Sequence, residues 1–94
     1  MANPAAYNAI IHGHVQGVFF RAFVFEKANE LGLTGYVGNL PSGRDVEVKA
    51  EGEKELLDKL VELIGIGPPL AKVDHIITHW SNYSGKFHQF VIRD

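Results

Sequence analysis

The alternation of apolar and polar residues along the chain predicts short strands separated by two amphipathic helices. Its most regular stretch is 46–51, where apolar residues alternate with charged ones. Because successive side chains of a strand point to opposite faces, Val46, Val48 and Ala50 are predicted to face the core. The charged side chains between them, that of Glu51 included, are predicted to face water. This stretch is typical of a strand with one solvated face.

The first helix is predicted over about Arg21–Leu31, because apolar residues recur there at intervals of three and four. Gly32 is well placed to end this helix in the left-handed conformation. The predicted buried stripe consists of Phe20, Val24, Ala28 and Leu31.

The second helix is predicted to begin near Gly52, where Glu53 and Glu55 place negative charge at the positive end of the helix dipole. The glycines and prolines of 65–69 end it. Its predicted apolar stripe consists of Leu56, Leu57, Leu60, Val61, Leu63 and Ile64.

The remaining strands are predicted at about Tyr7–Gly13, Thr34–Leu40, Lys72–Trp80 and Phe87–Arg93. The order is β-α-β-β-α-β plus a closing strand, which indicates an α+β, ferredoxin-like α/β sandwich. Two helices would then cover one face of a mostly antiparallel sheet. The 94 residues suit a single domain, 1–94, and we expect residues 1–6 to form a flexible lead.

Composition excludes several classes of function. The formal net charge of −2 gives no general attraction to nucleic acid or to anionic membranes. The chain has no cysteine, which excludes disulfides and thiolate chemistry. No apolar stretch is long enough to cross a bilayer, and the first residues do not form a signal peptide. We therefore expect a soluble, cytoplasmic protein.

Candidate chemistry concentrates where the first strand turns into the first helix. A helix N-terminus presents unpaired backbone N–H groups at the positive end of its dipole, and these favour an anion. The glycines permit positive φ angles, and Arg21 adds a planar fork of donors. The residues alone allow either an oxyanion-binding loop or a tight turn followed by a surface arginine. The segment reads Gly13-His14-Val15-Gln16-Gly17-Val18-Phe19-Phe20-Arg21.

This segment resembles the phosphate-binding loop signature of the acylphosphatases, G-x-V-Q-G-V-x-F-R, at every specified position. A second signature of that family is matched by Gly35-Tyr36-Val37-Gly38-Asn39, followed by Gly43. The resemblance covers essentially the whole chain. It implies a ferredoxin-like fold and hydrolysis of the mixed anhydride between a carboxylic acid and phosphate.

The resemblance also implies roles for individual residues. Arg21 corresponds to the arginine that binds the phosphoryl group, and Asn39 to the asparagine that positions the attacking water. Loop amides would bind the phosphoryl oxygens, and the side chain of Gln16 would help to hold the loop. The expected loop residues are Val15, Gln16, Gly17, Val18, Phe19 and Phe20.

Such a site requires no cofactor. The leaving group of an acyl phosphate is a carboxylate, which departs without being protonated, and a phosphoryl oxygen can take the proton of the water. Catalysis then rests on positioning and electrostatic stabilisation. The expected partners are a small acyl phosphate and inorganic phosphate as product and inhibitor, with no nucleic acid and no membrane. We expect a monomer.

Two pairs of histidines are the candidates for metal ligands. His12 and His14 share one parity on the first strand, and His75 and His79 share one on the fourth. A zinc site needs a third ligand at a defined spacing, and no such motif is present. We therefore predict no metal site. His14 occupies a variable position of the loop signature.

The sequence departs from the family pattern near the second signature. Arg44 and Asp45 place one extra residue before Val46, which predicts a longer turn or a bulge in the third strand. Tyr36 stands where tryptophan is common in the family, and Gly38 where a basic residue is common.

Three alternatives to an acylphosphatase remain at this point. A non-catalytic module that binds an anion or metabolite would need the loop but not Asn39. A domain that handles carbamoyl phosphate within a larger maturation enzyme would be expected to bring further domains. An RNA-binding module on the same topology is disfavoured by the acidic charge balance.

Overall fold

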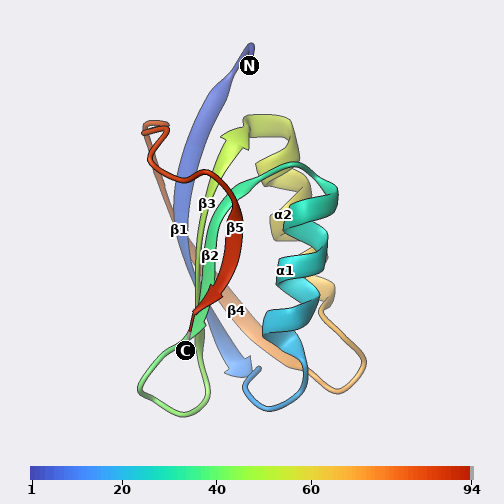
Figure 1. The fold of residues 1–94 in the computed structure, drawn as a ribbon. Helices are drawn as coiled ribbons and strands as arrows, with labels where there is room; N and C mark the ends of the chain where they lie inside the picture. Colours follow the sequence, from blue (N-terminus) through green and yellow to red (C-terminus); the bar gives the residue numbers. More distant parts are fainter. Residues whose placement is uncertain (94) are drawn as a thin grey trace.

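The computed structural model describes residues 1–93, which form one five-stranded sheet and two helices (Figure 1). The strands are β1 (Pro4–His14), β2 (Thr34–Asn39), β3 (Val46–Glu53), β4 (Lys72–Ser81) and β5 (Phe90–Arg93). The helices are α1 (Phe20–Glu30) and α2 (Lys54–Ile66).

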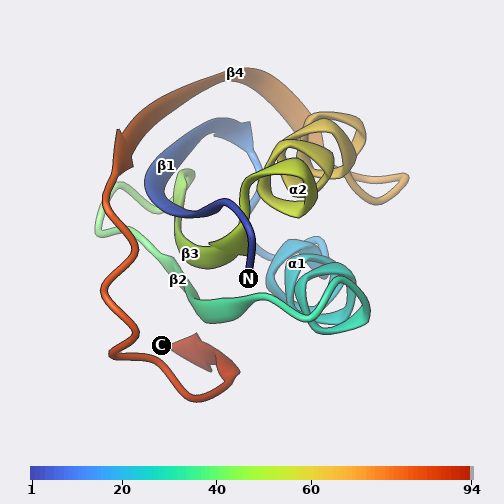
Figure 2. The ribbon, with the colours of Figure 1, turned by 90° about the horizontal axis from the view of Figure 1, so that it is seen from above.

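The strand order across the sheet is β4-β1-β3-β2-β5. β1 runs antiparallel to β3 and β4, and β2 runs antiparallel to β3. β5 pairs in parallel with β2. Both helices pack on the same face of the sheet (Figure 2). The predicted α+β, ferredoxin-like fold is thereby confirmed.

The core lies between the sheet and the helices. Tyr7, Ala9 and Ile11 of β1 are fully buried there, each opposite a buried residue of β3. The predicted helical stripes supply the other side of the core: Phe20, Val24, Ala28, Leu57, Leu60 and Ile64. Leu31, Leu56 and Val61 pack against this cluster while remaining partly exposed. Gly32 ends α1 with a φ of 70°, as predicted.

The prediction of a flexible lead over residues 1–6 is wrong for its second half. β1 begins at Pro4, which lies opposite Glu53 at the end of β3. The Lys54 N–H also donates to the carbonyl of Asn3 at 3.0 Å. β3 continues to the residue before α2, and its last residues, Gly52 and Glu53, pair with Ala5 and Pro4. This pairing extends β1 toward the N-terminus.

The prediction that Glu51 faces water is also wrong, because its side chain is only 1% exposed. The connection from β4 to β5 passes over the face of the sheet that lacks helices (Figure 2). It brings Ser84 and Gly85 to Glu51, whose carboxylate accepts hydrogen bonds from both backbone N–H groups at 3.1 and 3.0 Å and from Ser84 Oγ at 2.7 Å. The alternation along the strand correctly places Glu51 on the face that lacks helices, but it does not show that this face is covered there. The chain that covers it lies more than thirty residues away.

Candidate active site

The loop that joins β1 to α1 has an unusual backbone. Gly17 has a φ of 72° and Phe19 a φ of 62°, so left-handed residues alternate with ordinary ones just before the helix. Such alternation turns successive N–H groups toward one side and forms an anion-binding concavity. A Cβ on Gly17 would meet nothing within 4 Å. Glycine is therefore favoured at this position by its backbone conformation and not by lack of space.

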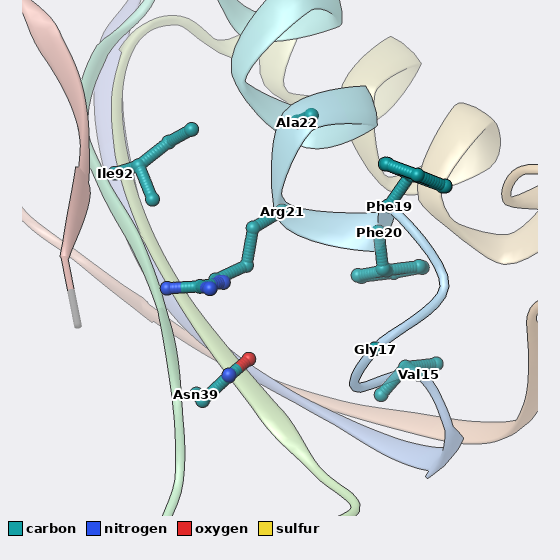
Figure 3. A pocket seen from close by; sticks show the side chains of 8 residues that line it. All are labelled: Val15, Gly17, Phe19, Phe20, Arg21, Ala22, Asn39 and Ile92. Atoms are coloured by element: carbon teal, nitrogen blue, oxygen red, sulfur yellow. The ribbon is translucent and has the colours of Figure 1, made fainter.

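A pocket of about 310 Å³ opens beside this loop (Figure 3). Arg21 reaches it from the first turn of α1, and Asn39 reaches it from the last residue of β2. The fold thus joins the two matched signatures at one place. The lining residues are Val15, Gly17, Phe19, Phe20, Arg21, Ala22, Asn39 and Ile92.

Asn39 carries an unusual polar atom. Its Oδ1 is buried, and among residues 1–93 it has no hydrogen-bond partner. Figure 3 shows the amide of Asn39 beside the pocket, with its oxygen turned toward the loop. A buried acceptor without a partner is costly, so its presence points to a donor that belongs to a ligand or a bound water.

Arg21 is positioned by the end of β5. Its Nη1 donates to the backbone carbonyl of Arg93 at 3.0 Å. The guanidinium of Arg93 in turn lies 3.7 Å from the centre of the Tyr36 ring on β2. Arg21 therefore reaches the pocket with its side chain attached to the sheet, which restricts where its other donors can point.

The sequence profile of the acylphosphatase family matches residues 7–92. The chain belongs to the acylphosphatase family. It is 46% identical over 85 residues to an acylphosphatase of Dehalococcoides mccartyi, covering 90% of this chain and 93% of that relative. The resemblance stated from the two signatures is confirmed, and with it the assignment of the chain as a hydrolase.

Solved structures agree with this assignment. The acylphosphatase of Bacillus subtilis superposes with a TM-score of 0.91 at 38% identity, covering 96% of this chain and 99% of that one. Full-length HypF, solved in a phosphate- and nucleotide-bound form, contains a similar segment with a TM-score of 0.88 at 31% identity. That match covers 98% of this chain and 12% of HypF.

Neither described helix has the length and apolar content needed to span a bilayer.

The backbone amide of Val15 does not face the pocket, although this amide was expected from the sequence to bind the phosphoryl group. The N–H of Val15 donates to the carbonyl of Arg44 at 3.3 Å, so this amide is directed away from the pocket. Val15 contributes its buried side chain to the pocket wall instead. The prediction of Val15 as an amide donor is therefore wrong, because the β2–β3 connection approaches the loop closely enough to bind this amide. Val18 belongs to the loop, and its side chain enters the core.

Gln16 is connected to the β2–β3 connection through its side chain. Its Nε2 donates to the carbonyl of Leu40 at 2.9 Å and to that of Asp45 at 2.8 Å. Leu40 follows Asn39 directly, so Gln16 joins the loop to the segment that carries Asn39. The side chain of Gln16 was expected to help hold the loop, and these two carbonyl groups are its partners.

Asp45 is the residue whose structural role sequence reasoning missed. Its carboxylate accepts a hydrogen bond from the Gly13 N–H at 3.3 Å, and its Oδ2 lies 3.2 Å from His12 Nδ1. Burial alone would raise the pKa of this carboxyl group. The Gly13 and His12 contacts outweigh it and hold the pKa below its ordinary value.

The extra residue lies in the β2–β3 connection and not in a bulge of β3. The β2–β3 ladder is unshifted from Thr34 opposite Glu51 to Asn39 opposite Val46. The sheet's irregularity lies between His12 and Gly13, where β1 pairs with β4. Of the two expectations, the longer turn is correct. No signal in the sequence could have identified Asp45, because its partners lie about thirty residues away.

The histidines do not gather as a metal site would require. His12 stacks on His75 with ring centres 4.4 Å apart, and His14 is exposed. Within residues 1–93, no three histidine, aspartate or glutamate side chains converge as potential ligands.

Proposed function

We propose that this chain hydrolyses the carboxyl–phosphate bond of acyl phosphates by in-line attack of a water held by Asn39. Arg21 and the N–H groups of Gln16, Gly17, Val18, Phe19 and Phe20 bind the phosphoryl group. The observation that carries the proposal is the buried Oδ1 of Asn39, which has no hydrogen-bond partner among residues 1–93 and lies beside a pocket lined by Arg21 and this loop.

The chemistry of that oxygen favours catalysis over simple anion binding. A carbonyl oxygen accepts hydrogen bonds, so it repels a phosphate oxygen and attracts the O–H of a water molecule. In a module that only binds anions, such an acceptor would weaken the complex. In a hydrolase, the same acceptor orients the nucleophile beside the bound phosphoryl group.

The reaction balances with the groups of this pocket. The water oxygen forms a bond to phosphorus while the bond from phosphorus to the acyl oxygen breaks. The carboxylate leaves with the bonding electron pair, and a phosphoryl oxygen takes the proton of the water. Arg21 and the loop amides stabilise the charge on the equatorial oxygens. No step requires a metal ion, so we propose a metal-independent reaction.

The proposal also concerns the oligomeric state and the cellular location of the protein. We propose that the enzyme is a monomer formed by a single domain. We place it in the cytoplasm, in keeping with the absence of cysteine. A solution mass near 10.4 kDa by light scattering is the expected result.

The decisive experiment is hydrolysis of benzoyl phosphate in the presence of a metal chelator. We expect activity in the wild type and a loss of roughly a hundredfold or more in kcat for Asn39→Ala, as for other groups that position or stabilise the reacting centre. Inhibition by inorganic phosphate should persist in this variant and weaken strongly in Arg21→Ala.

Asn29→Ala is the matched control. Asn29 is an exposed asparagine on α1 whose amide donates to the carbonyl of Phe25, outside the pocket. Its substitution should leave hydrolysis unchanged. Phosphate binding without hydrolysis in the wild type would instead support a binding module. Equal activity in wild type and Asn39→Ala would place the water elsewhere.

A further inference from the structure

Phe19 combines two features that the fold does not explain. Of residues 1–93, it is the one non-glycine residue with a positive φ, at 62°. Its side chain is also 81% exposed, although it is aromatic. A left-handed conformation is unfavourable for any residue with a Cβ, whereas glycine adopts it freely.

A strained residue persists where the structure around it enforces the conformation, and such residues cluster at active sites and ligand-binding sites. Burial does not account for a phenyl ring at this position, since the ring lies almost entirely outside the core. The alternating left-handed backbone of the loop requires a positive φ at this position, but it does not require a phenyl ring. Strain and exposure together therefore point to a function for the ring itself.

The position of Phe19 in the pocket indicates which function. Phe19 and Asn39 lie at opposite ends of the group of lining residues, with the pocket between them (Figure 3). In an in-line displacement, the nucleophile and the leaving group lie on opposite sides of phosphorus. A water held by Asn39 therefore directs the departing acyl group toward the end of the pocket where Phe19 lies. Ala22, three residues after Phe19, also lines the pocket and has a small side chain.

We propose that Phe19 is a specificity-determining residue whose ring forms an apolar platform for the acyl group. The preferred substrates are acyl phosphates with an aromatic or bulky apolar acyl group, and small acyl groups such as acetyl gain little from the ring. This inference rests on the proposed function, because it uses the in-line geometry to place the acyl group.

The test is the ratio of kcat/KM for benzoyl phosphate to kcat/KM for acetyl phosphate. Comparing the ratio between wild type and variant cancels the intrinsic reactivity of the two substrates. Phe19→Ala should lower this ratio by about five- to tenfold, as expected when an apolar contact with a ring is removed. Phe19→Leu, which keeps an apolar side chain, should recover part of the loss.

Phe25→Ala is the matched control, because Phe25 is a partly exposed phenylalanine on α1 that does not line the pocket. It should leave the ratio unchanged. An unchanged ratio in Phe19→Ala, whether both activities fall equally or neither falls, would overturn the inference while leaving the proposed function intact. If the wild type hydrolyses neither substrate, the proposed function and the inference both fail.

Discussion

The side-chain amide of Gln16 donates to the backbone carbonyl of Asp45 at 2.8 Å, and so joins the phosphate-binding loop to the connection between β2 and β3. The same nitrogen donates to Leu40, the residue after Asn39, at 2.9 Å. The two parts of the proposed site are therefore connected by one side chain. Gln16 therefore helps to fix the loop relative to Asn39, in addition to the pairing of the strands.

Gln16→Met should lower kcat for an acyl phosphate by about tenfold, because the variant keeps the size of the side chain but loses both hydrogen bonds. Inhibition by inorganic phosphate should change less than kcat. Gln89→Met, at an exposed glutamine before β5, is the control and should behave as the wild type. If kcat is unchanged in Gln16→Met, the loop keeps its position without this contact.

Asp45 should make the stability of the fold depend on pH in the acid range. Its pKa is lowered from the ordinary value of 3.8, so the ionised carboxylate stabilises the folded state. This contribution is complete above the ordinary pKa and is lost as pH falls through the lowered, folded-state value. The difference in urea midpoint between wild type and Asp45→Asn should therefore shrink as pH falls below about 4. A difference that grows on acidification would contradict the sign.

Glu51→Ala should destabilise the fold by about 1.5–3 kcal/mol, because it removes the buried carboxylate that accepts three hydrogen bonds from Ser84 and Gly85. Glu51→Gln keeps an acceptor oxygen and should cost less. Glu55→Ala, which removes an exposed carboxylate from the first turn of α2, is the control for the change in charge. Chemical denaturation measures all three. Similar stability of Glu51→Ala and Glu55→Ala would mean that the β4–β5 connection does not need Glu51.

Gly17→Ala should destabilise the protein by about 1 kcal/mol and weaken inhibition by inorganic phosphate. The cause is the positive φ alone, because the added methyl group would meet no neighbour within 4 Å. Gly17→Asn should be milder, since asparagine adopts the left-handed region more readily. Equal effects of alanine and asparagine would indicate that the loop rejects any side chain at this position.

Much of the fold was predictable because neighbouring residues determine it. The alternation at 46–51 and the stripes of α1 and α2 place the core-facing residues correctly, and Gly32 ends α1 as predicted. The two family signatures also indicate Arg21 and Asn39 as members of one site, and both residues line the same pocket. Their catalytic roles stay predictions until the variants are measured.

The sequence by itself thus determined the family, the order of the elements and the residues that turn β1 into α1, because these depend on spacing within a few residues. Only the tertiary structure decided that Glu51 is covered by the β4–β5 connection, that the Val15 amide binds Arg44, and that Asp45 holds the loop. Each of these contacts joins residues about thirty positions apart. Their formation depends on the path of the chain across the sheet, which no local pattern encodes.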